Sequence, residues 1–540
     1  MSFTRRSFLT ALALAPLARA AAGYTADRLR LSTCFFVLLG CLSLTARANV
    51  RLPALLTDNL VLQQKSNVAL WGWADPGEQV TVQAGWQKKP VTTTAGADGK
   101  WLLRVPTTKA GGPYELIIKG QNTLTIHNVL LGEVWLAGGQ SNMAFPVARR
   151  PNSGSYTGAI NAAEVIPQAN YPAIRMFTVK TQVADTPRPD VEGSWAVCSP
   201  QTVGEFSAVA YFFAQEIHQK TGYPIGIINS TWGGTPAESW TRKEVLENDP
   251  EFQPILARYQ RGLDSYEADY ARYKADVKAY QEEKAANPAL RRVVPREPVG
   301  ATSNKSPYKN YNAMIHGLEP YTLRGVIWYQ GENNADRAYQ YRRLFPALIR
   351  SWREEWQQPN LPFYFVQIAP HRSQNAEIRE AQLLTMQTVP HTGMAVITDW
   401  GDSVDIHPRN KQVVGHRLAQ WALAKQYGAK KLPYSGPIYQ SMKVDNQQVR
   451  LTFDHTNGGL VANGGALRDF TIAGPDSVFH PAQARVEGNA VVVSSPQVPQ
   501  PVAVRFGWSA VPNPNLYNGA GLPASPFRTD QWRGETERKR

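Results

Sequence analysis

The sequence predicts an α/β protein whose central part is flanked by β-rich segments. In residues 131–430, short apolar runs that end in polar loops alternate with stretches whose apolar residues recur at helical spacing. Such alternation favours a parallel sheet covered by helices. Residues 49–130 and 431–540 instead contain short apolar runs between turn signals, which indicates β-structure. A length of 540 residues fits about three domains of this kind.

The first 48 residues predict an export signal region rather than folded structure. The letters TRRSFL at 4–9 look like a twin-arginine signal, and a second apolar run, 34–44, precedes the cleavage-like ARA at 46–48. If translation began near Leu29, the run 34–44 with its ARA would by itself be the export signal. The letters LLGC, which end at Cys41, also loosely resemble a lipoprotein cleavage box. Neither run reaches the roughly 20 residues that span a bilayer. We therefore expect an exported protein, periplasmic or secreted, without a membrane span; lipoprotein anchoring is the alternative.

The net charge of +14 comes partly from this leader, where residues 1–48 hold six Arg and one Asp. A basic surface favours anionic substrates or adsorption to an anionic cell surface. No Lys/Arg run interleaved with aromatic residues indicates a nucleic-acid partner. Of the three cysteines, only Cys198 lies beyond the leader, so no internal disulfide is expected.

The flanking segments contain clear strand candidates. These are residues 68–71, 80–82 and 114–118 before the central part, and 449–453 and 491–493 after it. The spacing in the first segment, roughly ten residues, predicts that 49–130 forms a small β-sandwich-like domain. We expect 431–540 to form a second β-rich module.

The central part, 131–430, contains apolar strand candidates with helical stretches between them. The strand candidates are 134–137, 225–229, 325–328, 363–368 and 395–398, and the helical stretches are 206–220, 341–352 and 411–427. Pro346 marks a helix start inside the second helical stretch. Functional loops of such a sheet gather at the carboxyl ends of its strands.

An insertion at about 251–300 interrupts this alternation. Residues 255–286 are rich in Tyr, Ala, Lys and Glu and contain neither Gly nor Pro after Gly262. The pattern predicts one long amphipathic helix or a helical pair, acting as a lid or as a homodimer contact. Its aromatic stripe, which we interpret as packing, is Tyr266, Tyr270 and Tyr273.

The segment GGQSNM, residues 138–143, ends the apolar run 134–137. Its glycines let the backbone turn sharply, so Ser141 stands at the carboxyl end of a strand. A serine presented in this way is a candidate nucleophile if a base can reach it. The alternative is an N-cap serine at a strand-to-helix turn. Met143 replaces the last glycine of Gly-x-Ser-x-Gly, so this is not that nucleophile elbow.

Four segments in order resemble the sialate O-acetylesterase family, in the carbohydrate-esterase branch of the SGNH hydrolases. They are GGQSNM at 138–143, INSTWGGT at 228–235, GVIWYQGEN at 325–333 and DIHP at 405–408, followed by the family-like tail GLPASPFRTD at 521–530. The resemblance covers about residues 52–532. It implies an SGNH-type, flavodoxin-like parallel sheet covered by helices, and a serine esterase that needs no cofactor. The chain contains no His-Glu-x-x-His, paired-cysteine or dinucleotide-binding motif, so we expect no metal.

Ester hydrolysis by Ser141 requires a base, for which His407 is the candidate. Among nine histidines, it is the one that follows a carboxylate-rich loop at a strand end, and the resemblance implies the catalytic role. Related enzymes place an aspartate three residues before the histidine, where this chain has Val404. We favour Asp402 as the orienting acid, with Asp405 as the alternative. A Ser–His dyad oriented by a backbone carbonyl stays open.

Donors for the oxyanion are expected on loops at the same end of the sheet. The backbone N–H of Ser141 is one candidate. The turn at Gly233 and Gly234 is another, because glycine permits close approach; a plain strand-to-helix turn is the alternative. The resemblance implies that the Gln330 side chain is an oxyanion donor in place of the asparagine that other SGNH enzymes use. The alternative is that Gln330 is only part of a turn.

Three further residues are substrate-binding candidates. Glu332 either binds substrate hydroxyls or holds its loop, and Asn333 either binds substrate or caps the same turn. Arg379 either pairs with a substrate carboxylate or forms a structural ion pair. The expected partner is an acetylated carbohydrate. The resemblance implies removal of O-acetyl groups, most directly as a sialate 9-O-acetylesterase. The alternatives are an acetylxylan or other plant-glycan esterase and a non-catalytic carbohydrate-binding protein.

Overall fold

The computed structural model describes residues 49–151 and 153–539, and residues 49–540 cluster as one compact unit. The leader of residues 1–48, with Cys34 and Cys41, lies outside the described residues, so its role as an export signal stays a prediction. In the part of the chain that the structure describes, no helix has the length and apolar character needed to cross a membrane. Cys198 is a free, buried thiol.

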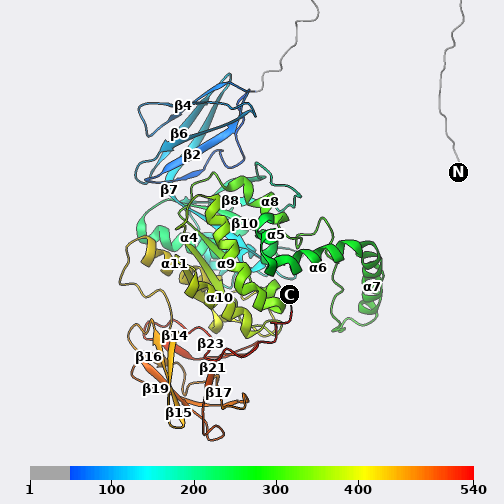
Figure 1. Ribbon diagram of the computed structural model, residues 1–540. Helices are drawn as coiled ribbons and strands as arrows, with labels where there is room; N and C mark the ends of the chain where they lie inside the picture. The colour runs from blue at the N-terminus through cyan, green and yellow to red at the C-terminus, as the bar shows by residue number, and fades with distance from the viewer. Residues whose placement is uncertain (1–48, 152, 540) are drawn as a thin grey trace, which may run out of the picture. The chain divides into compact units, whose positions relative to one another are not determined.

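The central feature is a mixed sheet that carries the functional loops (Figure 1). Its strands in spatial order are β13 (Thr392–Val396), β12 (Phe363–Gln367), β11 (Gly325–Tyr329), β7 (Thr123–Gly139), β10 (Ile225–Thr231), β8 (Tyr171–Val179) and β9 (Gly193–Cys198). Neighbours along this path pair in parallel, except that β8 and β9 are antiparallel. The predicted parallel sheet is therefore mixed at one edge. The sequence pattern did not indicate β8, because Pro172 and the buried Arg175 interrupt its apolar run.

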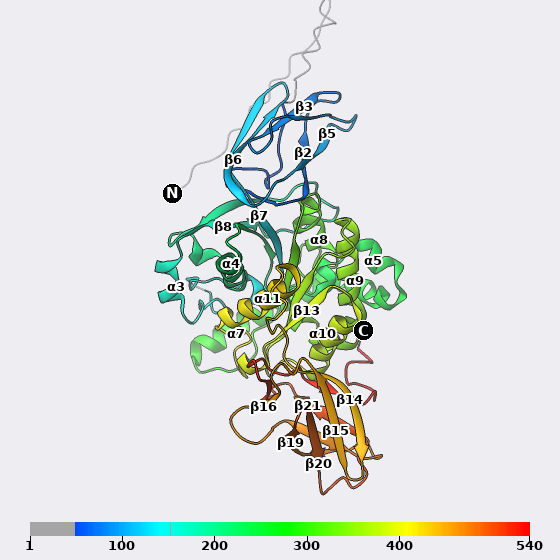
Figure 2. The same cartoon turned by 90° about the vertical axis from the view of Figure 1, so that its left-hand side faces the viewer.

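Helices cover both faces of this sheet (Figure 2). The α-helices are α2 (Ser141–Ala144), α3 (Ala162–Gln168), α4 (Ala208–Thr221), α5 (Lys243–Asn248), α6 (Gln253–Asp264), α7 (Tyr266–Ala286), α8 (Lys309–Met314), α9 (Ala338–Glu355), α10 (Ala376–Thr388) and α11 (Lys411–Gln426). On one face Trp135 of β7 packs against Phe213 of α4, and on the other Trp328 of β11 packs against Trp352 of α9. Pro346 lies inside α9 rather than at its start, because the helix already begins at Ala338.

Strand β7 joins the N-terminal β-structure to the central sheet. It is 17 residues long, pairs with β6 as far as Leu131 and pairs with β10 from Glu133 onward. The expected boundary between 130 and 131 therefore falls inside one continuous strand. The other N-terminal strands are β1 (Val61–Gln63), β2 (Asn67–Trp73), β3 (Gln79–Ala84), β4 (Val91–Thr94), β5 (Lys100–Pro106) and β6 (Gly111–Lys119).

The C-terminal part is β-rich and is tied to α10 by its last segment. Its strands are β14 (Ile438–Asp445), β15 (Gln448–Asp454), β16 (Leu460–Ala462), β17 (Phe470–Ala473), β18 (Phe479–Pro481), β19 (Gln483–Glu487), β20 (Ala490–Ser494), β21 (Ala503–Phe506), β22 (Leu516–Asn518) and β23 (Phe527–Arg528). The guanidinium of Arg528 lies 2.6 Å from Glu380 of α10 and also contacts Asp530. The family-like tail thus fixes the end of the chain against the central part.

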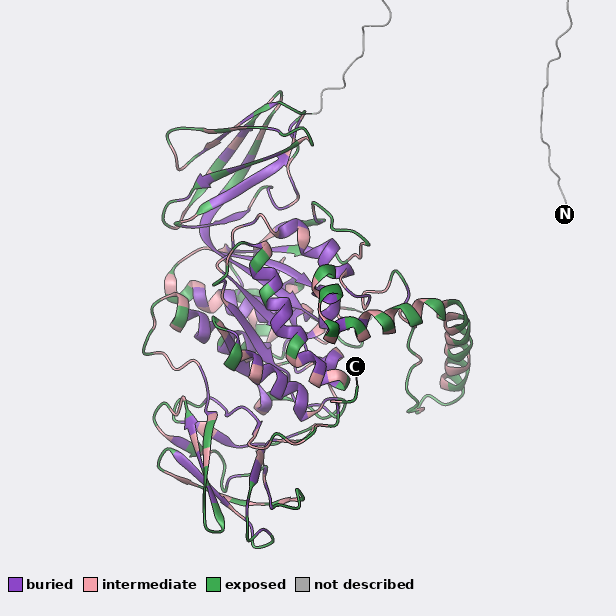
Figure 3. Cartoon of the chain, viewed as in Figure 1, coloured by how far each residue is buried: buried purple, intermediate pink, exposed green. Residues whose placement is uncertain are grey.

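The insertion forms the helical pair α6 and α7. Helix α6 contributes the buried Ile255, whereas α7 contains no buried residue (Figure 3). The tyrosines of α7 pack on one another: the rings of Tyr266 and Tyr270 stack with centroids 5.5 Å apart, and Tyr273 follows at 5.9 Å from Tyr270. Whether the pair acts as a lid or in a homodimer stays a prediction.

The end of β7 has no room for a side chain at Gly139. A Cβ there would lie 2.2 Å from the backbone oxygen of Tyr329, and the φ of +130° is one that other residues rarely adopt. We predict that Gly139→Ala lowers the free energy of unfolding by about 2 kcal/mol or more, measured by urea denaturation. The control is Gly262→Ala in α6, where a Cβ would lie 3.7 Å from its nearest neighbour, the backbone oxygen of Val299. Equal stability of both variants and the wild type would show that β7 tolerates a side chain there.

Candidate active site

The structure brings Ser141 and His407 into hydrogen-bonding distance. Ser141 opens α2 directly after β7, and the preceding Gln140 donates its backbone N–H to Tyr329 of the neighbouring β11. His407 lies on the loop between β13 and α11, and its Nε2 is 2.9 Å from the Ser141 Oγ. At this distance a histidine can accept the proton of a serine hydroxyl, which is the contact that a serine nucleophile requires.

The carboxylate beside His407 belongs to Asp405. Its Oδ1 accepts the backbone N–H of His407 at 2.9 Å and lies 3.7 Å from the His407 Nδ1. Asp402, the favoured acid, does not take this position. Its Oδ1 instead accepts the backbone N–H groups of Val404 at 2.7 Å and Asp405 at 3.1 Å, and these bonds lower its pKa. The Asp402 carboxylate therefore shapes the turn, and the alternative residue lies next to the imidazole.

The environment of His407 favours its neutral form. Burial, and to a lesser extent the charge of Lys411, lower the pKa of His407 to about 4, and the charge of Asp405 partly opposes them. An imidazole with this pKa is unprotonated at neutral pH. It can therefore accept the proton of Ser141 without first losing one of its own.

A buried chain of three side chains connects the serine turn to the histidine loop. Asn142 donates its Nδ2 to the Glu332 Oε1 at 2.6 Å and to the backbone oxygen of Ile406 at 3.0 Å. Its Oδ1 accepts the Lys411 Nζ, which also lies over the rings of Phe145 and Tyr329. Because Ile406 directly precedes His407, this amide ties the loop that carries His407 to the turn that carries Ser141.

Neither Asn142 nor Lys411 was expected to have a role at the site. Asn142 stands inside the quoted GGQSNM segment, so its position beside Ser141 was an available signal. Lys411 begins a predicted helix and carries no local sign that it is buried. Of the two roles expected for Glu332, the structure provides the one that holds a loop, through its bond to Asn142. The Glu332 Oε2 has no partner among the described residues, and burial raises the pKa of this carboxyl group.

The glycine turn after β10 lies beside the serine. A Cβ at Gly233 would lie 3.4 Å from the Ser141 Cβ, and both glycines of the turn line the same cavity as Ser141. Gly234 has a φ of +73°, and its carbonyl oxygen accepts the Asn333 side chain. The turn can thus bring backbone N–H groups close to the serine.

Gln330 does not fit the expected role of oxyanion donor. It is fully buried, and its Nε2 donates to the Asn334 Oδ1 at 2.7 Å and to the Thr235 carbonyl at 3.3 Å. Its Oε1 accepts the Tyr341 hydroxyl at 3.1 Å. Its hydrogen-bonding groups are therefore used inside the protein. Asn333, by contrast, lines the cavity.

Arg379 does not reach the cavity. Its side chain is fully buried in α10, where it donates to the backbone oxygen of Ser509, and burial lowers its pKa to about 10. Its Nε and Nη1 have no hydrogen-bond partner within the described ranges. Neither of its two expected roles, a contact to a substrate carboxylate or a structural ion pair, is provided by this arrangement.

Ser141 and His407 lie in a cavity of about 990 Å³. The wall near the serine includes Gln140, Tyr156 and Asn333. The Tyr156 ring lies 6.3 Å from that of His407. Within residues 49–151 and 153–539, no cluster of three or more His, Cys, Asp or Glu side chains is arranged to hold a metal ion.

Comparisons with known proteins agree on one kind of chemistry. Residues 299–424 match the family described as carbohydrate esterase, sialic acid-specific acetylesterase. The chain is 32% identical over 450 residues to the sialate O-acetylesterase of Rattus norvegicus, covering 74% of this chain and 78% of that one. It is 30% identical over 441 residues to the Homo sapiens sialate O-acetylesterase, covering 74% and 75% respectively.

A solved structure extends the similarity to the whole fold. The crystal structure of a carbohydrate acetylesterase from Xanthomonas citri is 38% identical and covers 89% of this chain and 100% of its own, with a TM-score of 0.75. These relatives support an esterase that removes O-acetyl groups from carbohydrates, not a non-catalytic carbohydrate-binding protein. By its identity to the curated relatives and the extent of the match, the chain belongs to the sialate O-acetylesterase family.

Proposed function

We propose that the protein hydrolyses acetyl esters of sugars by a serine mechanism. The Ser141 Oγ attacks the acetyl carbonyl while His407 takes its proton, and His407 then protonates the departing sugar oxygen. Water, deprotonated by His407, attacks the acetyl-serine and releases acetate and free Ser141. The observation that carries the proposal is the 2.9 Å separation between the Ser141 Oγ and the His407 Nε2.

Within this mechanism, the backbone N–H groups of Ser141 and Gly234 are the proposed oxyanion donors. Asp405 orients and stabilises the protonated imidazole, and Asn142 holds the loop that carries His407. The proposal also assigns the central sheet to the SGNH type. Its support is the order of the four motif segments and the position of Ser141 at the end of β7.

The proposed substrate is a sialic acid carrying a 9-O-acetyl group, because the named relatives are sialate O-acetylesterases. Acetylated xylan or another plant glycan is a second candidate. Its support is the Xanthomonas citri relative, which is 38% identical and is described as a carbohydrate acetylesterase without mention of sialic acid. Acetate release from 9-O-acetyl sialic acid and from acetylxylan, measured side by side, distinguishes the two.

Removing the Ser141 hydroxyl is expected to abolish turnover. We predict that Ser141→Ala lowers kcat for p-nitrophenyl acetate by at least about 10³-fold, because no other group takes over nucleophilic attack. Thermal unfolding should remain unchanged. The control is Ser155→Ala, which removes a hydroxyl from the same cavity and should leave the rate within a few-fold. A Ser141→Ala enzyme with near-normal turnover would end the serine proposal.

The two aspartates of the histidine loop are expected to respond differently. Asp405→Asn should lower kcat by about tenfold or more, or about 1.4 kcal/mol, because the imidazolium loses its nearest negative charge. Asp402→Asn should mainly lower thermal stability, since its carboxylate bonds to backbone N–H groups. Steady-state kinetics and melting curves check both. If both variants keep full activity, a Ser–His dyad replaces the triad.

The positive charge of Lys411 should set the acidic limb of the pH profile. Protonated Lys411 disfavours the imidazolium, and the pKa of Lys411 itself, lowered to about 7 by burial, leaves it charged in the acidic range. We therefore predict that Lys411→Met raises the pKa of His407 from about 4 and moves the acidic limb of kcat to higher pH. Kinetics between about pH 4 and 8 test this. Lys411→Arg, which keeps the charge, should leave the limb in place, and an unmoved limb in Lys411→Met would contradict the assignment.

A further inference from the structure

The catalytic cavity continues from Ser141 to the insertion. Its far wall includes Arg258 of α6, together with Arg296 and Lys305 from the segment that returns from α7 to α8. Arg337, which follows β11, lines the same wall. The insertion therefore contributes positive side chains to the cavity in which the ester would be cleaved.

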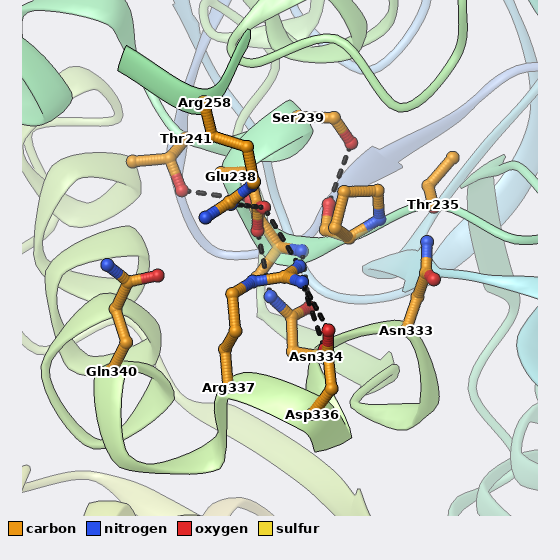
Figure 4. Close-up of polar contacts among 12 residues, drawn as sticks. Thr235, Glu238, Ser239, Thr241, Arg258, Asn333, Asn334, Asp336, Arg337 and Gln340 are labelled. Atoms are coloured by element: carbon orange, nitrogen blue, oxygen red, sulfur yellow. Dashed lines mark hydrogen bonds and ion pairs between the residues drawn. The ribbon is translucent and has the colours of Figure 1, made fainter. Parts of the chain in front are cut away.

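Two of these cations share one buried carboxylate (Figure 4). The Glu238 Oε1 lies 3.2 Å from the Arg258 Nη2 and 3.4 Å from the Arg337 Nη2. Its Oε2 accepts the Asn334 Nδ2 at 2.8 Å, so the carboxylate is fully engaged. Arg337 also contacts the exposed Asp336 at 2.7 Å. Among the described residues, the Arg258 Nη1 and the Arg337 Nε have no hydrogen-bond partner.

The other two cations are not held by a salt bridge among the described residues. The carboxylate that acts on Lys305 is that of Glu297, through its charge and without a salt bridge. Burial lowers the pKa of Lys305, and the charge of Arg296 lowers it further, while the charge of Glu297 opposes both effects. The two positive charges are thus close enough to repel each other.

This wall carries more positive than negative charge. The cationic side chains on it are Arg258, Arg296, Lys305 and Arg337, and the carboxylates are Glu238 and Asp336. Glu332, the remaining carboxylate of the cavity, is near the serine and is bonded to Asn142. Guanidinium and ammonium groups that outnumber the carboxylates around a partly enclosed space favour an anion, and carboxylates suit them well.

We propose that this wall is a recognition subsite for a carboxylate on the acetylated glycan, with Arg296 and Lys305 as its specificity-determining residues. The inference rests on the proposed function, because the ester must lie at Ser141 while the acidic group reaches the insertion. Arg258 and Arg337 add positive charge and are held in place by Glu238. A nonulosonic acid and a uronic acid both present such a carboxylate.

The test compares an acidic substrate with its uncharged counterpart. For the wild type, kcat/KM for 9-O-acetyl-N-acetylneuraminic acid should exceed that for its methyl ester, and the difference should shrink with added salt. The double variant R296Q/K305Q should lower kcat/KM for the acid about tenfold and leave the methyl ester and p-nitrophenyl acetate unchanged. An acetylated galacturonic acid in parallel distinguishes a uronate from a nonulosonate ligand.

A matched control removes the same charge elsewhere. K88Q/K89Q changes two exposed lysines that do not line the cavity, and the preference for the acid should persist. Equal kcat/KM for the acid and its methyl ester in the wild type, or an equal loss for both in R296Q/K305Q, would overturn the subsite. Either result leaves the serine mechanism standing as long as p-nitrophenyl acetate hydrolysis depends on Ser141. Hydrolysis that does not depend on Ser141 would refute the proposed function instead.

Discussion

The site depends on the amide of Asn142. This one side chain accepts a hydrogen bond from Lys411 and donates to Glu332 and to the carbonyl of Ile406. Its orientation is therefore fixed, because rotating the amide would place its N–H groups against the ammonium and its oxygen against the carboxylate. The loop that carries His407 is irregular and is shaped by its own aspartates, and the Asn142 bond ties it to the turn where the Ser141 Oγ lies 2.9 Å from the His407 Nε2.

The fold supports this contact by placing a rigid strand beneath it. β7 pairs with β10 and β11 along its second half, and its last residue, Gly139, lies against the backbone of Tyr329. The same strand begins in the N-terminal β-structure, where it pairs with β6. Displacing that β-structure would therefore disturb the strand that presents the serine. The N-terminal part is thus a structural extension of the central sheet, which the change in sequence pattern near residue 130 did not indicate.

The sequence predicted the features that depend on short motifs, and it did not predict those that depend on packing between distant segments. That Ser141 and His407 meet could be expected, because both stand in short family-like motifs, Ser141 just after an apolar run and His407 in the polar loop that follows another. Asp402 was favoured over Asp405, but Asp405 lies beside the imidazole, because the Asp402 carboxylate is used to bond the backbone of its own turn. Gln330, by resemblance, and Arg379, as one of its two expected roles, were candidates for the site, but their exposure depends on partners far along the chain, such as Thr235 and Ser509.

The insertion shows how an active site can acquire selectivity without changing its chemistry. Ser141 and His407 lie on the turn after β7 and on the loop before α11, whereas Arg258, Arg296 and Lys305 come from a segment that interrupts the α/β alternation. Such a segment can vary in charge while the serine, the histidine and their supporting amide stay as they are. Glu238 makes this arrangement stable, since its buried carboxylate offsets part of the repulsion between Arg258 and Arg337. The remaining positive charge of the cavity wall can then interact with an anionic ligand, whereas a neutral sugar would make no ion pair with it.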